Sequence, residues 1–404
     1  MLTDFELMRE LAKKSERRIV LLVLDGLGGL PVTKGGPTEL EAARTPGMDR
    51  LAGEGALGLT LPIRRGITPG SGPAHLGLFG YDPLQYIVGR GVLEAVGVGV
   101  RVQAGDVAAR GNFCTLDGQG RITDRRAGRI ATESAIPLVE RLARLNVPGA
   151  AFEVRHVKEH RFGLIARGQG LQSDLEDTDP QATGVPPLSV RARRPEGQST
   201  AELFNRWITA ATEALADQPT ANGLTLRGFS TDPRLPTMES VFALHPACVA
   251  VYPMYRGVSQ LVGMDVLDFG GESPEDEFAA VRAAWDRFDF FFVHIKKTDS
   301  RGEDGDFQAK VEAIEAVDRA LPRLLELQPD VLAITGDHST PARLRSHSWH
   351  PVPFLLWAPA TIRPDASSTF GESACTAGGL GTFPAKDVLP LLLAHAERLD
   401  KFGA

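Results

Sequence analysis

The sequence predicts an α/β protein with a doubly wound core and a smaller α+β domain inserted into it. Short, continuously apolar runs recur along the chain, and such runs are typical of strands buried on both faces of a parallel sheet. Stretches with helical apolar spacing lie between these runs. The middle of the chain differs in composition, because it contains basic segments that are rich in glycine and proline.

Four apolar runs mark the expected core strands, at residues 19–24, 290–295, 331–335 and 352–357. The helical patterns lie at residues 275–287, 306–327 and 386–399. Strands that alternate with helices favour a layered α/β sheet over an all-α or all-β fold. We therefore predict a core formed by residues 1–104 and 231–404, with the inserted domain at residues 105–230.

The composition is that of an ordinary globular protein, and the net charge of -7 gives no general attraction to nucleic acid or to an anionic membrane. We expect neither as a partner, so an anionic substrate must be held by local cations or by metal. Three widely spaced cysteines predict packed, reduced thiols. No signal-peptide pattern and no apolar run of about 20 residues is found, which predicts a cytoplasmic protein.

Potential metal ligands follow three of the predicted strands. Asp25 follows the first, Asp299 lies just beyond the second, and the pair Asp337 and His338 follows the third. Each alone is weak evidence, since Asp-Gly usually marks a turn and Asp-His is often a helix cap or a surface pair. In a parallel sheet, however, all three strand ends lie at one edge, where ligands bind. Carboxylates with imidazoles suit Mn, Zn, Fe or Mg, and two such ions can clamp a phosphoryl group during its displacement.

Two further histidines precede the strand predicted at residues 352–357. His347 is the natural additional imidazole ligand, because its loop leads into that strand. For His350, a surface position and a role in the site are equally compatible with the sequence.

A glycine- and proline-rich loop carries the candidate nucleophile, Ser71, ahead of an apolar helical stretch at residues 76–81. A serine at a helix N-terminus can simply cap the helix. The same geometry also places its hydroxyl where free N–H groups and the helix dipole stabilise phosphate, and metal binding would activate the hydroxyl. The spacing alone leaves both interpretations open.

Basic side chains gather in the middle of the chain, where most arginines would by default be solvated surface residues. Guanidinium groups also fit phosphate and carboxylate, and a small, doubly anionic substrate would need several of them. The candidate substrate-binding residues in this region are Arg110, Arg125, Arg126, Arg129, His160, Arg161 and Arg227.

Several strings, in order and over nearly the whole chain, resemble one known family, the archaeal-type 2,3-bisphosphoglycerate-independent phosphoglycerate mutases of the alkaline phosphatase superfamily. The resemblance implies an alkaline-phosphatase-like α/β core interrupted by a substrate-binding domain. The strings include VLDGLGGLPV, GSGPAHLGLFGYDP, GRGVLEAVGVGV, DRRAGRI, HIKKTDSRGEDGD, TGDHSTP and HSWHPVPF.

The resemblance also implies two divalent metal ions, drawn from Mn, Mg, Zn or Co. The implied ligands are Asp25, Ser71, Asp337 and His338 for one ion, and Asp299 and His347 for the other. The family usually has a further histidine ligand four residues after the aspartate, where this chain has Glu303, a carboxylate that can still coordinate. The family commonly has aspartate directly after the serine, where this chain has Gly72.

By resemblance, the enzyme is an isomerase of glycolysis and gluconeogenesis. Ser71 attacks the phosphate of 3-phosphoglycerate, and the glycerate turns and takes the phosphoryl group back on its 2-hydroxyl. The arginines hold the glycerate carboxylate, while Lys296 neutralises charge near the metals unless it is a surface lysine.

Two alternatives remain open from the sequence. One is a metal-dependent phosphatase, or a mutase of another small phosphoester such as a pentose phosphate. The other is an inactive, metal-binding regulatory relative.

Overall fold

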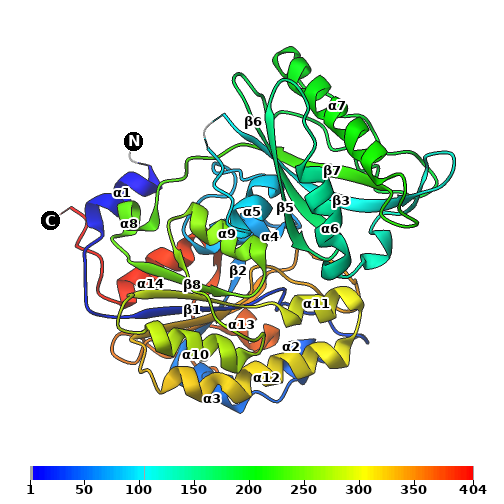
Figure 1. The fold of residues 1–404 in the computed structure, drawn as a ribbon. Coiled ribbons are helices and arrows are strands. Elements are labelled where there is room, and N and C mark those ends of the chain that lie inside the picture. Colours follow the sequence, from blue (N-terminus) through cyan, green and yellow to red (C-terminus); the bar gives the residue numbers. More distant parts are fainter. Residues whose placement is uncertain (1–2, 104, 404) are drawn as a thin grey trace. The chain divides into compact units, whose positions relative to one another are not determined.

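The computed structural model describes residues 3–103 and 105–403. The chain divides into two compact units, Met1–Ile87 with Leu235–Ala404, and Val88–Arg234. The second unit thus begins ahead of residue 105, the predicted start of the inserted domain. Figure 1 shows the chain coloured along its sequence, with the second unit in cyan and green.

Among the described residues, the first unit is built on an eight-stranded sheet in the order β13-β2-β12-β11-β1-β10-β8-β9. All neighbouring strands are parallel except β12, which is antiparallel to both of its neighbours. The four predicted core strands are confirmed as β1, β10, β11 and β12. The strands are β1 (Ile19–Leu24), β2 (Ala56–Leu61), β8 (Pro246–Ala250), β9 (Asp265–Val266), β10 (Phe290–Ile295), β11 (Val331–Thr335), β12 (Val352–Trp357) and β13 (Gly381–Pro384).

Helices cover both faces of this sheet, which confirms the predicted doubly wound α/β class. In Figure 1, α3, α10 and α12 lie below the sheet, and α9 and α14 lie above it. None of the helices in the described part of the chain is both long and apolar enough to cross a membrane. The helices of this unit are α1 (Asp4–Leu11), α2 (Glu39–Ala42), α3 (Pro46–Glu54), α4 (Ser71–Leu78), α8 (Met238–Phe242), α9 (Pro253–Leu261), α10 (Pro274–Ala284), α11 (Lys297–Asp304), α12 (Phe307–Leu325), α13 (Glu372–Ala377), η3 (Ala385–Asp387) and α14 (Val388–His395).

The strand register brings distant polar residues to one edge of the sheet. Strand β1 lies between β10 and β11 and is parallel to both, with Leu24 opposite Ile295 and Val23 opposite Thr335. The segments that follow these three strands therefore leave the sheet together. Strand β12 runs in the opposite direction, so its beginning, and the loop before it, lie at the same edge.

A buried lysine joins the loops at this edge. The Lys310 ammonium donates hydrogen bonds to the carbonyl oxygens of Gly26 and Thr340, each at 2.9 Å, and of Gly28 at 3.1 Å. Gly26 has φ +64, and a Cβ atom there would lie 2.5 Å from the Thr340 hydroxyl oxygen. The loop after β1 can approach the loop after β11 this closely because residue 26 is glycine.

The second unit is an α+β structure whose strands are all paired antiparallel. Over the residues described, its sheet has the order β4-β3-β6-β5, and β7 pairs with β3. Its elements are α5 (Arg90–Gly97), β3 (Val107–Leu116), β4 (Ile122–Asp124), η1 (Ala127–Arg129), α6 (Thr132–Ala143), β5 (Ala151–Lys158), β6 (Arg161–Arg167), η2 (Pro195–Gly197), α7 (Gln198–Leu215) and β7 (Gly223–Ser230).

The two faces of this second sheet differ in character. Side chains that alternate along the strands, such as Ala109, Phe113 and Leu164, form an apolar core with α6 and α7. Residues of opposite parity, such as Arg110 and Asn112 on β3, point to the other face, where α5 packs. We call this second face the arginine face, and its members are described below.

Candidate active site

Five of the predicted metal ligands meet beyond the carboxyl edge of the first sheet. They form two overlapping groups, Asp25 with Asp337 and His338, and Asp299 with His338 and His347. In each group the candidate ligand atoms lie within 4.8 Å of one another. All are buried except His347, which is partly exposed. We call these five residues the acidic cluster, and their role as ligands stays a prediction.

The electrostatics of this cluster suit a cation. Within the described residues, Asp25 Oδ1 and Asp337 Oδ2 are buried and have no hydrogen-bond partner. Burial, together with the nearby Asp25 carboxylate, raises the pKa of Asp337 well above its usual range. Burial acts to raise the pKa of Asp25 as well, but Lys296 and the neighbouring imidazoles outweigh it and hold that pKa well below its usual range. Adjacent buried carboxyl groups with unpaired oxygens fit a divalent metal better than any neutral partner.

The hydrogen bonds of Thr340 allow us to assign the tautomer of His338. The Thr340 hydroxyl donates to Asp299 Oδ1 at 2.7 Å, and its oxygen also lies 3.0 Å from His338 Nδ1. Since the hydroxyl has one proton, Nδ1 must be the donor in the second contact. The Nε2 lone pair of His338 therefore faces Asp25 at 3.3 Å and Asp337 at 3.2 Å, as a metal ligand requires.

His347 is oriented in the same way. Its Nδ1 donates to the carbonyl oxygen of Pro69 at 3.0 Å, so that in the neutral ring Nε2 carries the lone pair, 3.7 Å from Asp299 Oδ1. The ring stacks on His338 with 3.6 Å between centroids. The bond to Pro69 also ties the loop before β12 to the loop that carries Ser71.

Ser71 is the first residue of α4, and Gly70 is the N-cap. The helix shows no side-chain cap hydrogen bond, so the interpretation of Ser71 as a capping residue is wrong. Its Oγ lies instead 3.4 Å from His338 Nε2. The hydroxyl therefore faces the acidic cluster from a helix N-terminus, where backbone N–H groups and the helix dipole favour anions.

Two other predicted positions lie apart from the acidic cluster. Glu303 is exposed on α11 and belongs to neither ligand group, so its role as a ligand stays a prediction. His350 also belongs to neither group. Its Nδ1 contacts the Ser348 hydroxyl at 3.0 Å, and its ring stacks on Trp349.

Lys296 lies against the acidic cluster and is only partly exposed, so the surface-lysine interpretation is wrong. Its ammonium donates to Asp25 Oδ2 at 2.8 Å and also to Asp299 Oδ2, so it contacts both ligand groups. The Tyr255 hydroxyl on α9 donates to the same Asp25 oxygen. His294 on β10 stacks on the Tyr255 ring at 3.7 Å. Sequence reasoning missed Tyr255 and His294, since neither follows a recognised strand end.

His75 is a further residue that the sequence analysis missed. It lies four positions after Ser71 on α4, hence on the same face of the helix, and its Nδ1 donates to the Ser71 carbonyl at 2.8 Å. Complete burial is the main cause that lowers the pKa of His75 to about 3. A neutral imidazole there holds the first turn of α4 against Asp337, which is 3.3 Å away. The spacing of Ser71 and His75 was the signal that could have found it.

The arginine face of the second unit gathers several predicted substrate-binding residues. The register places Arg110 opposite Arg227, and Asn112 opposite Arg161, and residues paired in this way share a face. Burial lowers the pKa of His160 to about 3, and the next causes are the charges of Arg161, Arg126, Arg110 and Arg129. The charges of these arginines therefore act on one buried imidazole.

The arginines differ in how far their charge is already neutralised. Arg125 makes a two-pronged pair with Asp179, at 3.1 and 2.7 Å, and Arg227 lies 3.5 Å from the same carboxylate. Arg126 and Arg129 flank a turn in which Ala127 and Gly128 have positive φ. As far as the structure describes the chain, no acidic side chain pairs with Arg126 or Arg129, so both can receive an anion.

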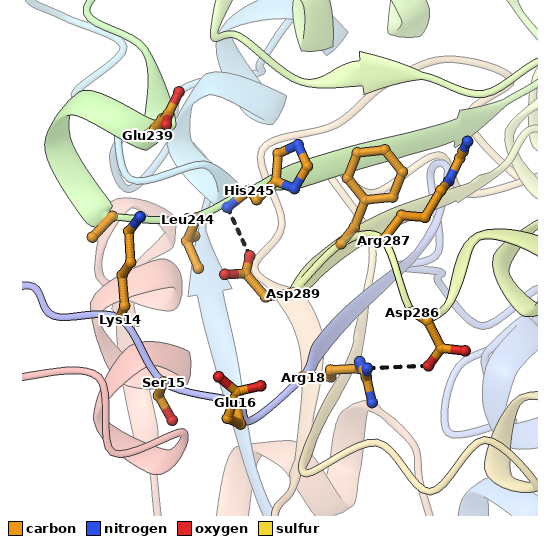
Figure 2. Close-up of a pocket in the computed structure, with 12 residues that line it drawn as sticks. Lys14, Ser15, Glu16, Arg18, Glu239, Leu244, His245, Asp286, Arg287 and Asp289 are labelled. Carbon is orange, nitrogen blue, oxygen red and sulfur yellow. Dashed lines mark hydrogen bonds and ion pairs between the residues drawn. The ribbon is translucent and has the colours of Figure 1, made fainter.

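A separate hollow of about 240 Å³ lies at the opposite edge of the first sheet, ahead of β1, β8 and β10 (Figure 2). Arg18 lies 3.2 Å from Asp286, and the His245 backbone N–H donates to Asp289 at 2.7 Å. This hollow carries none of the predicted site residues.

The doubly wound sheet and the acidic cluster at its carboxyl edge define the chain as an α/β enzyme. Residues 52–221 match the family described as 2,3-bisphosphoglycerate-independent phosphoglycerate mutase. A probable mutase of this kind from Thermus thermophilus is 51% identical, over 99% of each chain. Another from Aquifex aeolicus is 49% identical, over 99% of this chain and 100% of its own.

Two solved structures are also similar. The cofactor-independent phosphoglycerate mutase from Thermoplasma acidophilum is 30% identical, covers 94% of this chain and 100% of its own, and has a TM-score of 0.70. The PH0037 protein from Pyrococcus horikoshii is 30% identical, covers 96% and 99%, and has a TM-score of 0.84. The chain belongs to the family of 2,3-bisphosphoglycerate-independent phosphoglycerate mutases, which confirms the family predicted by resemblance.

Proposed function

We propose that this chain interconverts 3-phosphoglycerate and 2-phosphoglycerate without 2,3-bisphosphoglycerate, and that Ser71 carries the phosphoryl group between the two positions. The observation that carries the proposal is the approach of the Ser71 hydroxyl to His338 Nε2, at 3.4 Å, at the rim of the acidic cluster. Membership of the mutase family supports the reaction, and the helix N-terminus supports a site for phosphate.

The proposal includes two divalent metal ions, which we expect to be Mn, Mg, Zn or Co, with manganese as the first candidate. Bound there, such ions would act as Lewis acids that lower the pKa of a hydroxyl and neutralise phosphoryl oxygens. The unpaired oxygens of Asp25 and Asp337 and the assigned lone pairs of His338 and His347 fit this role. The residues that would hold the ions are Asp25, Ser71, Asp337 and His338 for one, and Asp299 and His347 for the other.

The transfer takes two balanced steps. In the first, a bond forms between Ser71 Oγ and phosphorus, the bond from phosphorus to the 3-oxygen breaks, and that oxygen takes up the proton that the serine gave up. In the second, the 2-hydroxyl oxygen of the glycerate forms a bond to phosphorus, the bond from phosphorus to Ser71 Oγ breaks, and the proton of that hydroxyl passes to Ser71. Positioning and charge neutralisation supply most of the acceleration in such transfers. Lys296 and the first turn of α4 provide fixed positive charge for the phosphoryl oxygens.

The glycerate must keep its place between the two steps, and we assign its anionic carboxylate to the arginine face. Arg126 and Arg129 have no acidic partner in the described ranges, and their charges, like that of the buried Arg110, act on His160. Guanidinium groups bind a carboxylate through two parallel hydrogen bonds, which fixes its direction as well as its position. A cytoplasmic location completes the proposal, since Cys114, Cys248 and Cys375 are buried and free.

A product assay tests the function. The purified protein is incubated with 3-phosphoglycerate and Mn²⁺, and the products are followed by phosphorus NMR. We expect 2-phosphoglycerate to accumulate to equilibrium with little inorganic phosphate. Inorganic phosphate as the main product would favour the phosphatase alternative. A protein that binds metal but forms neither product would favour the inactive regulatory alternative.

A further inference from the structure

Glu94 is a buried carboxylate in the second unit that the proposed mechanism leaves unused. It lies on α5 with no exposed surface, and neither carboxylate oxygen finds a hydrogen-bond partner among the residues described. Two guanidinium groups lie near Oε1, with Arg90 Nε at 3.5 Å and Arg110 Nη1 at 3.8 Å. Burying a carboxylate without hydrogen bonds costs free energy, so the presence of Glu94 at this position indicates a specific role.

The helix that carries Glu94 is fixed closely against the arginine face. A Cβ atom at Gly91 would lie 2.5 Å from the Ala108 carbonyl oxygen, so residue 91 must be glycine for α5 to pack directly on β3. The Val92 backbone N–H, in the first turn of α5, donates to the Ser230 hydroxyl at 3.2 Å. Glu94 therefore occupies a defined position against the sheet, less than one helical turn beyond these contacts.

Arg110 is the partner whose position matters for binding. Its side chain is almost fully buried, and Nε lacks a hydrogen-bond partner in the described structure. Burial lowers the pKa of Arg110 to about 10, and the positive charge of Arg90 is the next cause. Glu94 is the acidic group that offsets these effects. A guanidinium placed among other cations in this way would turn towards any available anion.

We propose that Glu94 is a positioning residue that holds the Arg110 guanidinium on the arginine face, so that its remaining N–H groups meet the anionic substrate. The inference rests on the proposed function and deepens it, because it explains how one binding arginine is oriented. Glu94 itself does not touch the substrate. Its Oε1 lies 3.8 Å from Arg110 Nη1 and leaves the other terminal nitrogen to the ligand.

Steady-state kinetics of a double-mutant cycle test this inference. Glu94→Gln keeps the shape of the side chain and removes its charge, and we expect KM for 3-phosphoglycerate to rise about tenfold while kcat changes by less than about threefold. Arg110→Met should raise KM at least as much. Because Glu94 acts through Arg110, adding Glu94→Gln to Arg110→Met should raise KM no further.

A matched control comes from the same unit. Glu153 pairs with Arg155 at 3.0 Å and with Arg167 at 2.8 Å, and it lies on β5, which β6 separates from the strand that carries Arg110. Glu153→Gln removes an ion-paired carboxylate without reaching Arg110, so KM should stay at the wild-type value. If both glutamine variants raise KM equally, the effect is a general loss of structure and the inference is overturned.

Further results would overturn either the inference on Glu94 or the proposed function. An unchanged or lowered KM in Glu94→Gln, or additive effects in the cycle, would show that the carboxylate does not position Arg110. If Glu94→Gln does not fold, Glu94→Asp replaces it, because its side chain is one methylene shorter and holds the carboxylate farther from Arg110. An unchanged KM in Glu94→Asp overturns the inference. A wild-type protein that does not form 2-phosphoglycerate refutes the proposed function instead.

Discussion

The unprotonated Nε2 of His338 faces the Ser71 hydroxyl across 3.4 Å, and a hydrogen bond from Nδ1 to Thr340 fixes it in that state. The nucleophile is thus linked to the acidic cluster through the His338 imidazole. The contact of Nδ1 with the Thr340 hydroxyl fixes the tautomer of that ring. Thr340 also donates to Asp299, so a single hydroxyl orients one residue of each ligand group. Such outer hydrogen bonds commonly tune metal affinity.

The first prediction concerns this hydroxyl. Thr340→Val keeps the shape of the side chain but removes the group that fixes the His338 tautomer, and we expect metal affinity to fall about 10- to 100-fold. Calorimetric titration of metal into metal-free protein measures the effect. Thr335→Val is the control, because that hydroxyl bonds the Pro353 carbonyl at 2.8 Å and does not contact the acidic cluster. Equal metal affinities in the two variants would contradict the assigned tautomer.

The second prediction concerns the arginines without acidic partners. Arg126→Ala and Arg129→Ala should each raise KM for 3-phosphoglycerate about tenfold or more, since each removes a guanidinium that is free to bind an anion. Arg121→Ala is the control, because Arg121 pairs with Asp117 at 2.9 Å on the surface of the same unit. Kinetics that leave KM unchanged in both variants would exclude these residues from the substrate site.

The third prediction concerns the buried lysine between the loops. Lys310→Met removes the three hydrogen bonds that one buried ammonium donates to loop carbonyl oxygens, and we expect the free energy of unfolding to fall by about 3–5 kcal/mol. Chemical denaturation measures the loss. Lys386→Met serves as the control, because Lys386 is more exposed and pairs with Asp4 and Asp82 near the surface. Similar losses in both variants would show that the three carbonyl bonds are unimportant.

The fourth prediction concerns Glu277 on α10, where burial raises the pKa to about 9 from an ordinary value of 4.5. Between these values the native state binds more protons than the unfolded chain, so stability is lost as pH rises. Glu277→Gln does not titrate there. Its stability advantage should be absent near pH 4 and grow by up to ~1.4 kcal/mol per pH unit towards pH 9.

Denaturant unfolding of both proteins across this pH range measures the advantage. Glu275→Gln, at a more accessible position of the same helix, controls for the loss of one carboxylate. If the stabilities of wild type and Glu277→Gln run parallel with pH, Glu277 is ionised in the native state and the prediction is wrong.

The sequence predicted the core strands well because they are buried on both faces. A run such as residues 19–24 can remain uniformly apolar only in that environment. The convergence of Asp25 and Asp337 followed from the same observation, since parallel strands end at one edge. The place of His347 depends in addition on the reversed direction of β12, which the apolar pattern does not encode.

Contacts between distant segments were beyond sequence reasoning. Tyr255 contacts Asp25 although the two residues are 230 positions apart in the sequence. No motif near Tyr255 indicates that it belongs to the site. The two interpretations of Ser71 differ only in the direction of one hydroxyl, which spacing cannot determine. Arg110 and Arg227 share a face because of a strand register that the sequence does not reveal. Glu94 sits in an apolar helix and was indistinguishable from an ordinary exposed acid.

The phosphoryl carrier is the central claim, and Ser71→Ala tests it most directly. The variant is incubated with 3-phosphoglycerate and Mn²⁺, its products are followed by phosphorus NMR, and its metal content is measured in parallel. We predict that formation of 2-phosphoglycerate falls by at least about a thousandfold while metal stays bound. A metal-loaded alanine variant that still interconverts the two phosphoglycerates would contradict the account.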